Sequence, residues 1–338
     1  MKVRQALLAG PLGFGAAPLG NMFRDIAEDE ALATVDAAWA AGTRYFDTAP
    51  FYGAGLSEIR LGKALSGRPR GEYVLSTKVG RLILDELEDP AARDQGEKGD
   101  IFKYGRANKI ALDYSADGAK RSIEDSLKRL GVDHIDFVWI HDVAQDFHGD
   151  RWLSMFEAAR VGAFPALTRL REEGVIKGWG LGVNRVEAVE VMLDLAEADP
   201  DGTLLAGRYT LLDHERALQR LMPAAQKRGV DIVVGGPYSS GVLAGGKHFE
   251  YGAVPPQIAA KLEKLKALCA RHQVPIKAAA LQFCLAHPAT AAVIPGASKP
   301  ERIVEDHAAL AAKIPDDFWR ELREDGLVST AAPLPIDP

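Results

Sequence analysis

The sequence of 338 residues predicts an α/β fold of the closed (β/α)8 barrel type. Short runs rich in branched and aromatic residues alternate with longer segments of helical spacing, and most of these segments end near a glycine. Eight such units follow one another along the chain. Length alone favours two domains, but α/β barrels of this size are often single domains. We therefore expect residues 1–338 to form one barrel domain.

The predicted strands are short and separated by turn residues. They span residues 13–15, 44–49, 73–79, 134–141, 175–183, 203–210, 231–235 and 291–294. The intervening helices show apolar residues on one face and a closing glycine. In the first of the clearest helices, Leu32, Val35 and Trp39 precede Gly42; in the second, Ile123, Leu127 and Leu130 precede Gly131. In the third, Leu167 and Leu170 precede Gly174. Two more helices are predicted over residues 186–195 and over residues 218–228, the latter before Gly229.

A doubly wound open sheet uses the same alternation and is the competing fold. Its signature is missing near the start of the chain. The glycine-rich stretch GPLGFGAAPLG does not match G-x-G-x-x-G after a long apolar strand, and no helix opens on it. The pattern favours the barrel.

Three segments depart from the strand–helix rhythm. Residues 81–116, which include DELEDPAARDQGEKGD, form a polar insertion after the third strand, on the side where such barrels bind substrates. It is either a solvated loop or a partial lid. Residues 237–256, rich in glycine and tyrosine, interrupt the seventh unit, and residues 313–338 are expected to form an irregular tail.

Composition excludes several classes of protein. The net charge of −6, 47% hydrophobic and 26% charged residues are ordinary for a soluble globular chain, and no basic block suggests nucleic acid or an anionic membrane as a partner. The first residues lack a signal peptide's apolar segment, and no window reaches transmembrane length. Cys269 and Cys284 lie among apolar neighbours, where buried, reduced thiols are expected. We expect a cytoplasmic protein.

Polar residues end three neighbouring predicted strands. Asp47 ends the second, Lys78 the third and His141 the fourth, and Tyr52 follows Asp47 by five residues. Side chains at these ends face the site of a barrel. Taken singly, each of the three strand-end residues has a simpler explanation: Asp47 caps a turn, Lys78 is exposed to solvent, and His141 satisfies backbone groups. Together they form a candidate catalytic group.

The four residues also make chemical sense together. Lys78, in the apolar setting YVLSTKVG, needs a counter-charge, which Asp47 on the neighbouring strand can supply. A cation near Tyr52 favours the phenolate and lowers the pKa of the phenol from about 10. Such a phenol can transfer a proton near neutral pH.

At these spacings, Asp47, Tyr52, Lys78 and His141 resemble the catalytic tetrad of the aldo-keto reductases. FDTAPFYGAGLSE, STKVG, FVWIHD and AAVIPGASKPERIVED are similar to four motifs of that family, in order, and the likeness covers nearly the whole chain. The resemblance implies an aldo-keto reductase barrel in which Tyr52 transfers the proton, Lys78 and Asp47 tune it, and His141 orients the substrate oxygen. It implies a nicotinamide cofactor, NAD or NADP, and no metal.

The likeness is strongest to one branch of the family. GFGAAPLGNMF, LDYSADGAKRSIEDSLKRLG, GLGVN and AGRYTLLD resemble the branch of the D-threo-aldose 1-dehydrogenases, also called L-fucose or L-galactose dehydrogenases, and of pyridoxal 4-dehydrogenase. The resemblance implies oxidation of an aldose, of the L-fucose, L-galactose or D-arabinose type, at C1 to the lactone. Oxidation of pyridoxal as its hemiacetal, or general aldehyde and ketone reduction, is the alternative.

Cofactor contacts carry over less cleanly. Asn184 matches the asparagine that holds the nicotinamide amide, but Val183, Ala206 and Gly235 stand where serine, glutamine and the stacking tyrosine are usual. Tyr238 is either a shifted aromatic surface or a loop packing residue. The resemblance implies pyrophosphate and adenosine contacts from Pro237, Ser239, Ser240, Gly241, Gly296, Ser298, Lys299, Arg302, Glu305 and Asp306.

The choice between NAD and NADP depends on residues 296–302. Lysine at Gly296 or arginine at Ser298 is common among NADP-using members, and both are absent, whereas Lys299 and Arg302 remain close to the expected 2′-phosphate. The two missing anchors, together with the cofactor use that the branch resemblance implies, favour NAD, whereas Lys299 and Arg302 leave NADP open.

Two other classes stay open. Some family relatives are cofactor-binding regulatory subunits of membrane channels, and the full tetrad argues against that role. A metal-dependent barrel hydrolase would need an H-x-H pair where GFG stands. The sequence leaves the oligomeric state open, a homo-oligomer included.

Overall fold

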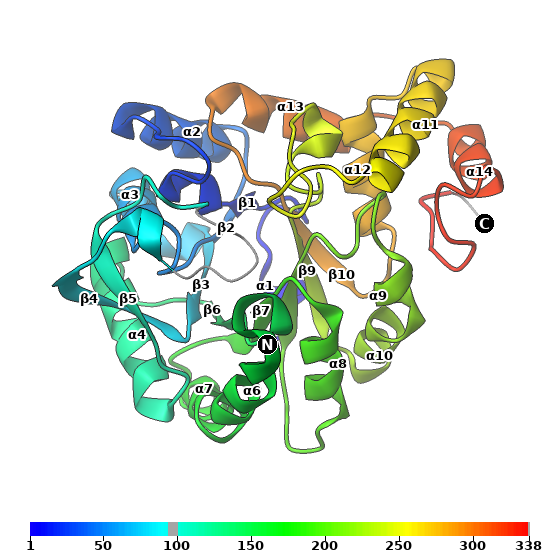
Figure 1. Cartoon of the computed structure of the whole chain (residues 1–338). Coiled ribbons are helices and arrows are strands. Elements are labelled where there is room, and N and C mark those ends of the chain that lie inside the picture. Colours follow the sequence, from blue (N-terminus) through cyan, green and yellow to red (C-terminus); the bar gives the residue numbers. More distant parts are fainter. Residues whose placement is uncertain (94–100, 337–338) are drawn as a thin grey trace.

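The computed structural model describes residues 1–93 and 101–336, and in it eight parallel strands form a ring surrounded by helices (Figure 1). The eight strands pair side by side in their order along the chain. Parallel bridges from Leu12 to Val293 and from Gly15 to Gly296 join the last strand to the first. The predicted barrel is confirmed. Its strands are β1 (Phe14–Gly15), β2 (Tyr45–Asp47), β3 (Val74–Val79), β6 (Phe137–His141), β7 (Gly178–Val183), β8 (Gly202–Ala206), β9 (Asp231–Gly235) and β10 (Thr290–Ile294).

All eight predicted strands are present, and most are shorter than predicted. The largest difference is at residues 203–210, where β8 ends at Ala206. Gly207 then takes a positive φ of 72°, which turns the chain out of the sheet. Residues 207–213 therefore lie outside the sheet in an irregular segment.

The helices that pack around the barrel follow the predicted periodicity. They are α2 (Glu28–Ala40), α3 (Leu56–Leu65), α4 (Ala116–Leu130), α7 (Ala163–Glu172), α8 (Val186–Asp194), α10 (Leu221–Arg228), α12 (Ile276–Leu285) and α13 (Pro300–Ala311). Helix α4 shows why they form: the Ser115 hydroxyl accepts a hydrogen bond from the backbone of Gly118 at its start, and Gly131 ends it in the left-handed region.

Further helices lie outside this ring or extend it. They are α1 (Val3–Ala6), α5 (Gln145–His148), α6 (Trp152–Val161), α9 (Glu215–Gln219), α11 (Pro256–His272) and α14 (Asp316–Glu324). The helix predicted over 218–228 begins earlier and is divided into α9 and α10, because the backbone of Arg220 (φ −145°, ψ −50°) is not helical.

Residues 81–116 are not simply a solvated loop. They contain an antiparallel hairpin of β4 (Arg81–Leu87) and β5 (Asn108–Leu112), and Ile101 and Phe102 are buried against Phe51. Residues 94–100 of the predicted insertion lie outside the described residues. The second half of the insertion therefore packs against the loop that follows β2, at the carboxyl end of the barrel.

The expectation of an irregular tail over 313–338 is wrong for part of that range. Residues Asp316–Glu324 form α14, because Phe318, Trp319 and Leu322 recur at helical spacing and are buried. The chain is irregular in residues 313–315 and again from Asp325 to the last described residue, Ile336.

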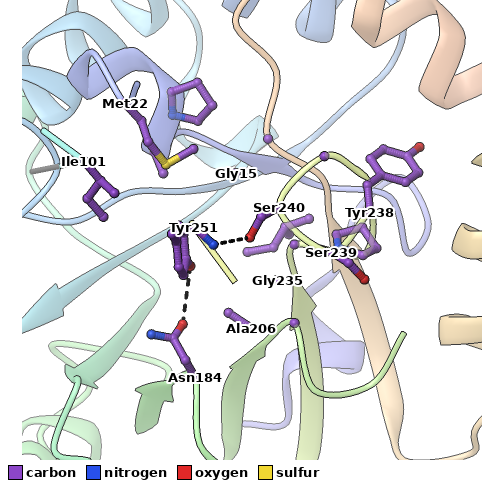
Figure 2. A pocket seen from close by; sticks show the side chains of 18 of the residues that line it. Gly15, Met22, Ile101, Asn184, Ala206, Gly235, Tyr238, Ser239, Ser240 and Tyr251 are labelled. Atoms are coloured by element: carbon purple, nitrogen blue, oxygen red, sulfur yellow. Dashed lines mark hydrogen bonds between the residues drawn. The ribbon is translucent and has the colours of Figure 1, made fainter. Parts of the chain in front are cut away.

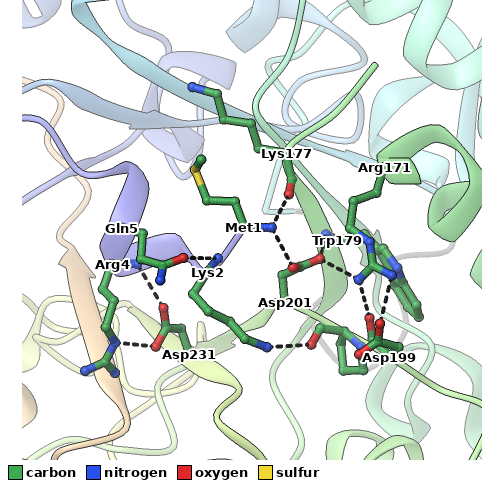
Figure 3. A network of polar contacts seen from close by, with 11 residues as sticks. Met1, Lys2, Arg4, Gln5, Arg171, Lys177, Trp179, Asp199, Asp201 and Asp231 are labelled. Atoms are coloured by element: carbon green, nitrogen blue, oxygen red, sulfur yellow. Dashed lines mark hydrogen bonds and ion pairs between the residues drawn. The ribbon is translucent and has the colours of Figure 1, made fainter. Parts of the chain in front are cut away.

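The amino-terminal end of the barrel, which we call the floor, is closed by α1 and a set of ion pairs (Figure 3). Arg4 Nε lies 2.5 Å from Asp231, and Arg171 lies 3.0 Å from Asp201. Val3 of α1 packs in a small core with Trp139 and Phe137. The floor thus combines an apolar plug with a polar rim.

Two further observations bear on the sequence expectations. Cys269 and Cys284 are free and buried, as predicted. Within residues 1–93 and 101–336, no helix combines the length and apolar character needed to cross a lipid bilayer.

Candidate active site

The four candidate catalytic residues line one cavity at the carboxyl end of the barrel, which we call the mouth. Asp47 ends β2, Lys78 lies in β3, His141 ends β6, and Tyr52 follows β2 in the next loop. The cavity has a volume of about 400 Å³. The structure therefore brings together residues that are up to 94 positions apart in the sequence (141 minus 47).

Asp47 and Lys78 form a buried ion pair. Lys78 Nζ lies 2.6 Å from Asp47 Oδ2 and also donates to the Thr48 carbonyl oxygen at 2.8 Å, while the Ser76 hydroxyl donates to Asp47 Oδ1 at 2.6 Å. Burial raises the pKa of Asp47, and Lys78 acts against that rise. The predicted charge pair is present, and each partner satisfies the other in a dry site.

Tyr52 is held firmly against the barrel. Its backbone N–H donates to the Ala49 carbonyl oxygen, and Gly20 packs so closely that an added Cβ there would lie 2.5 Å from the Tyr52 carbonyl carbon. The Tyr52 ring centroid lies 4.8 Å from Lys78 Nζ and 5.7 Å from the His141 ring. The Tyr52 ring thus lies beside both residues.

The electrostatics of Tyr52 differ from the sequence expectation. Burial, followed by the carboxylates of Asp47 and Asp142, raises the pKa of Tyr52 well above its ordinary value. The expectation that Lys78 lowers this pKa is wrong for the cavity without substrate, because Asp47 balances the lysine's charge at 2.6 Å. The cation that lowers the Tyr52 pKa is Arg81, which sequence reasoning did not single out.

His141 is buried and fixed through its backbone. The Tyr114 hydroxyl donates to the His141 carbonyl oxygen at 2.8 Å. Burial lowers the pKa of His141 well below its ordinary value, and the charges of Arg81 and Lys78 lower it further. The imidazole is therefore neutral at neutral pH.

An apolar wall surrounds the ring of Tyr52. We call this set the aromatic wall, and it comprises Met22, Phe23, Phe51, Ile101, Phe102 and Phe147. Phe102 stacks on Tyr52 with ring centroids 5.6 Å apart. No pattern in the sequence indicates this contact, because Ile101 and Phe102 come from the polar insertion.

The insertion is also bonded directly to the loop that carries Tyr52. The Arg106 backbone N–H donates to the Gly53 carbonyl oxygen at 3.1 Å, and its guanidinium donates to the Ala54 carbonyl oxygen at 3.2 Å. Asn21 donates to the Tyr104 carbonyl oxygen at 2.9 Å. Residues 101–106 therefore form a fixed side of the cavity.

The cavity continues from Tyr52 across a shelf without large side chains. Ala206 and Gly235, which pair in the sheet, lie there with Gly207 and Gly236. An added Cβ on Gly207 would meet no atom within 4 Å, so space is open above it. A flat ring such as nicotinamide fits this shelf, with Asn184 at its edge.

The loop after β9 offers groups suited to a pyrophosphate. Pro237, Tyr238, Ser239, Ser240 and Gly241, which the sequence predicts as cofactor contacts, all line the cavity. Ser239 and Ser240 both have positive φ, 50° and 57°. The Ser239 N–H donates to the Gly236 carbonyl oxygen and the Gly241 N–H to that of Tyr238, while the Ser239 hydroxyl lies 2.9 Å from the Thr210 hydroxyl and the Ser240 hydroxyl accepts from the Tyr251 N–H. A pyrophosphate at this loop would therefore compete with existing hydrogen bonds.

Two tyrosines of this loop have different positions (Figure 2). Tyr238 is directed away from the shelf, and its hydroxyl donates to Asp306 at 2.7 Å. Tyr251, which sequence reasoning did not single out, lies over the shelf, and its hydroxyl is 3.4 Å from Asn184 Oδ1. The aromatic surface near the expected nicotinamide position therefore belongs to Tyr251 and not to Tyr238.

The far end of the cavity lies against the start of α13. Gly296, Ser298, Arg302 and Asp306 line it, whereas Lys299 and Glu305 are not among the lining residues. Arg302 lies 3.0 Å from Glu305. This end combines a helix amino terminus with mixed charges, as expected for a phosphate and an adenosine.

Lys277 of α12 also lines this end, and sequence reasoning missed it. Its Nζ lies 2.6 Å from Asp306 and 3.0 Å from Glu305. Burial raises the pKa of Asp306, while Lys277 and Tyr238 act in the opposite direction. A single lysine near the start of an ordinary helix carries no local pattern that would mark it.

Comparison with known proteins agrees with this geometry. The model of the Aldo/keto reductase family matches residues 11–325. The chain is 40% identical to a pyridoxal 4-dehydrogenase of Microbacterium luteolum, with 96% of each chain covered, and 38% identical to a D-threo-aldose 1-dehydrogenase of a Pseudomonas species, with 94% of each covered. The holo form of an aldo-keto reductase from Bacillus halodurans is similar in structure, with a TM-score of 0.70, 28% identity, and coverage of 94% of this chain and 92% of that one.

Proposed function

The chain belongs to the aldo/keto reductase family, and from this premise we propose that it oxidises the hemiacetal carbon of an aldose to the lactone, with Tyr52 as the proton-transfer residue. It is an oxidoreductase that acts on a small molecule and uses a nicotinamide cofactor. The observation that carries the proposal is the convergence of Asp47, Tyr52, Lys78 and His141 at one end of a cavity that continues over an open shelf.

In this proposal, Tyr52 takes the proton from the C1 hydroxyl of the substrate. When bound, the cofactor supplies the acceptor for the hydride that leaves the same carbon. Only the phenolate form of Tyr52 can accept that proton, so Tyr52 must first lose its own proton to solvent. The raised pKa of Tyr52 makes the phenolate scarce at neutral pH, and oxidation should therefore become faster as the pH rises. The charge of Lys78, 4.8 Å from the ring centroid, stabilises the Tyr52 side chain as it changes charge.

His141 has a positioning part in the same step. Its neutral imidazole can donate one hydrogen bond to the substrate oxygen, because a buried neutral ring carries a single N–H. That bond directs the reacting hydroxyl toward Tyr52, whose ring lies 5.7 Å away. Asp47 and Ser76 keep Lys78 in place beneath the phenol.

Pyridoxal is the second candidate substrate, and the aromatic wall favours it. Phe51, Phe102 and Phe147 present flat apolar faces beside Tyr52. Such faces suit an aromatic ring at least as well as a sugar ring. Reduction of a simple aldehyde would use the same residues in the reverse direction, with Tyr52 as the acid.

We also propose that NAD is the preferred cofactor. Arg302 is bonded to Glu305, and Lys277 is bonded to Glu305 and Asp306. A 2′-phosphate would have to displace these carboxylates to reach either cation, whereas a free ribose hydroxyl would not.

A spectrophotometric assay tests the function and the substrate together. Purified protein is mixed with NAD or NADP and with L-fucose, L-galactose, D-arabinose, D-galactose or pyridoxal, and formation of the reduced nicotinamide is followed. We expect turnover on an aldose with NAD. Turnover on pyridoxal alone would move the assignment to the second candidate. Cofactor binding without turnover on any of these substrates or on simple aldehydes would instead support a regulatory, non-catalytic role.

A further inference from the structure

A second buried ion pair lies beside the proposed catalytic residues. Arg81, the first residue of β4, places its guanidinium 2.9 Å from Asp142 Oδ2, and both side chains are about 5% exposed or less. Asp142 directly follows His141 and lines the cavity. Neither residue has a part in the function proposed above.

The surroundings of Arg81 hold it in a dry position. Its guanidinium carbon lies 4.3 Å from the ring centroid of Phe51 and 4.9 Å from that of Phe147. A cation between two aromatic faces is favourable, but it still needs a counter-ion once it has lost water. Asp142 is that counter-ion.

Asp142 is held in a strained conformation that directs its side chain toward His141. Its φ is +53°, in the left-handed region that residues other than glycine rarely adopt. Its backbone N–H donates to the Gly182 carbonyl oxygen at 2.9 Å, which keeps this conformation in place. The result is a carboxylate oxygen 3.3 Å from His141 Nε2.

The two nitrogens of His141 therefore meet different environments. Nε2 faces a carboxylate oxygen, whereas Nδ1 is buried and has no hydrogen-bond partner among the described residues. A lone pair on Nε2 would be repelled by that oxygen, but an N–H there is attracted. The proton of a neutral imidazole belongs on Nε2 in this setting.

Without Arg81, the Asp142 carboxylate would affect the charge of the His141 ring as well as its tautomer. A negative charge within about 4 Å favours a second proton on the ring and raises the pKa of a histidine. Arg81 removes this effect, because it balances Asp142 at 2.9 Å. A doubly protonated His141 would add a positive charge to a site that already holds Lys78.

We propose that Arg81 and Asp142 form a positioning pair for His141: Asp142 keeps the imidazole proton on Nε2, and Arg81 balances Asp142 so that the ring stays neutral. The catalytic consequence rests on the role proposed for His141 above, whereas the tautomer and charge of the ring do not. The 3.3 Å contact of Nε2 with Asp142 lacks hydrogen-bond geometry, so an Nε2–H stays available as the donor to the substrate oxygen.

Several other groups around His141 bear on its titration. Those that face it or its carboxylate neighbour are Lys78 of β3, Arg81 of β4, Asp142 after β6, Asp146 and His148 of α5, Tyr52 of the loop after β2, and Tyr114 before α4. Arg81 and Lys78 oppose protonation of the ring, and Asp142 favours it. Removing Arg81 alone therefore shifts the balance toward the charged ring.

The test is ¹⁵N NMR of the full-length protein with labelled histidine, in which His141→Gln identifies the His141 signals. In the unaltered protein, we expect a neutral ring with the proton on Nε2 between about pH 6 and 8, where the Asp142 carboxyl, whose pKa is about 6, is ionised. We expect Arg81→Met to raise the pKa of His141 by about 1 to 3, and the kcat to fall about 10-fold or more on the acid side of its pH profile. Arg81→Met combined with Asp142→Asn should restore the neutral ring.

A matched ion pair at the floor supplies the control. Arg70→Met breaks the contact of Arg70 with Asp136 and should lower the thermal stability without moving the His141 signals or the pH profile. A proton on Nδ1 in the unaltered protein would overturn the proposal even if no variant folds. So would an Arg81→Met protein that is less stable but keeps the neutral Nε2–H ring. Normal turnover in His141→Gln would contradict the proposed function instead, and would leave the NMR result standing.

Discussion

The floor and the mouth of the barrel both contain buried ion pairs, and the two sets differ in the number of cations that surround each carboxylate. At the floor, the Asp136 carboxylate contacts Arg70 at 2.6 Å and Lys177 at 2.7 Å, and it also accepts a hydrogen bond from the Leu75 backbone. At the mouth, Asp142 contacts Arg81 and lies beside His141, whose Nδ1 has no partner in the part of the chain that the structure describes. Similar charges occupy opposite ends of the same strands.

The pKa directions express this difference. Burial alone would raise the pKa of Asp136, but Arg70 and Lys177 together lower it below its ordinary value. Burial raises the pKa of Asp142 to about 6 despite Arg81, and it raises that of Asp47 despite Lys78. Charges at the floor are stabilised by their partners, whereas those at the mouth are held in an environment that disfavours them. Such unfavourable positions are typical of functional sites.

The largest expected effect is at the mouth. We expect Tyr52→Phe to lower kcat by about 10³-fold or more, because the ring keeps its packing on Phe102 but loses the proton-transfer group. Cofactor affinity, measured by fluorescence titration, and thermal stability should change little. Normal turnover in this variant would contradict the proposed mechanism.

Lys78→Met should affect both activity and stability. It leaves Asp47 buried without its counter-ion, which destabilises proteins by about 3–5 kcal/mol unless the acid takes up a proton. We expect kcat to fall by about 100-fold or more. Urea unfolding and steady-state kinetics, measured on the same samples, check the two parts. A Lys78→Met protein that is stable and fully active would contradict the view that the ion pairs at the mouth serve catalysis.

Arg70→Met is the corresponding change at the floor. It should lower the free energy of unfolding by about 1–3 kcal/mol, because Asp136 keeps Lys177 and the Leu75 N–H but loses a charged hydrogen-bond donor. The kcat should stay within about twofold of the original. A large loss of kcat would show that the two ends are coupled.

The pH dependence of stability should have opposite signs at the two ends. The pKa of Asp136 is lower in the folded state than its ordinary 3.8, so its contribution is fully present above that value and is lost as the pH falls through the folded pKa. The pKa of Asp142 is about 6 in the folded state, so its ionisation lowers stability as the pH rises from 3.8 to about 6.

Urea unfolding at a series of pH values separates these contributions. Asp136→Asn should flatten the loss of stability in acid, and Asp142→Asn should remove the decline between about pH 4 and 6. The quantity to compare is the slope of the free energy of unfolding against pH. Its absolute value is less informative, because the amide variants also change hydrogen bonds in a way that does not depend on pH. Equal slopes in Asp142→Asn and the original protein would contradict the raised pKa.

The smallest expected effect concerns the aromatic wall. Phe102→Ala removes the ring that stacks on Tyr52 and should raise KM for pyridoxal more than for L-fucose, by about 10-fold, if the wall contacts the substrate. The ratio of kcat/KM for the two substrates is the measurement. Leu153→Ala, at an exposed position outside the cavity, is the control.

Much of this molecule can be predicted from its sequence. The eight strands are predictable because each is an apolar run bounded by turn residues, and Asp47, Lys78 and His141 stand out because charge at the end of such a run is unusual. Tyr52 can be joined to them because it follows Asp47 by five residues and matches the tetrad of the family that the sequence resembles. The strands are recognised from local sequence patterns, and the residues at their ends are brought together because all strand ends of one kind meet at the same end of a barrel.

Other parts depend on contacts between distant segments. Phe102 lies in a charged insertion, Lys277 lies in an ordinary helix, and Tyr251 lies in a glycine-rich loop, so none has a local pattern that indicates its position. In the sequence, Arg81 is simply a polar residue after a strand, and only the packed structure shows it between Phe51 and Phe147. The helix α14 was missed because the proline-rich end of the chain concealed the spacing of Phe318 and Trp319.

The hydrogen bonds between Arg106 and the loop of Tyr52 have a consequence for descent and for engineering. Residues 101–106, which line the cavity, are hydrogen-bonded to the loop that contains the proposed proton-transfer residue Tyr52. Exchange of residues 101–106 with those of a relative would shift Tyr52 unless residues 50–55 were exchanged with them. We therefore expect recombination between relatives to succeed only when its crossover points keep the two segments together.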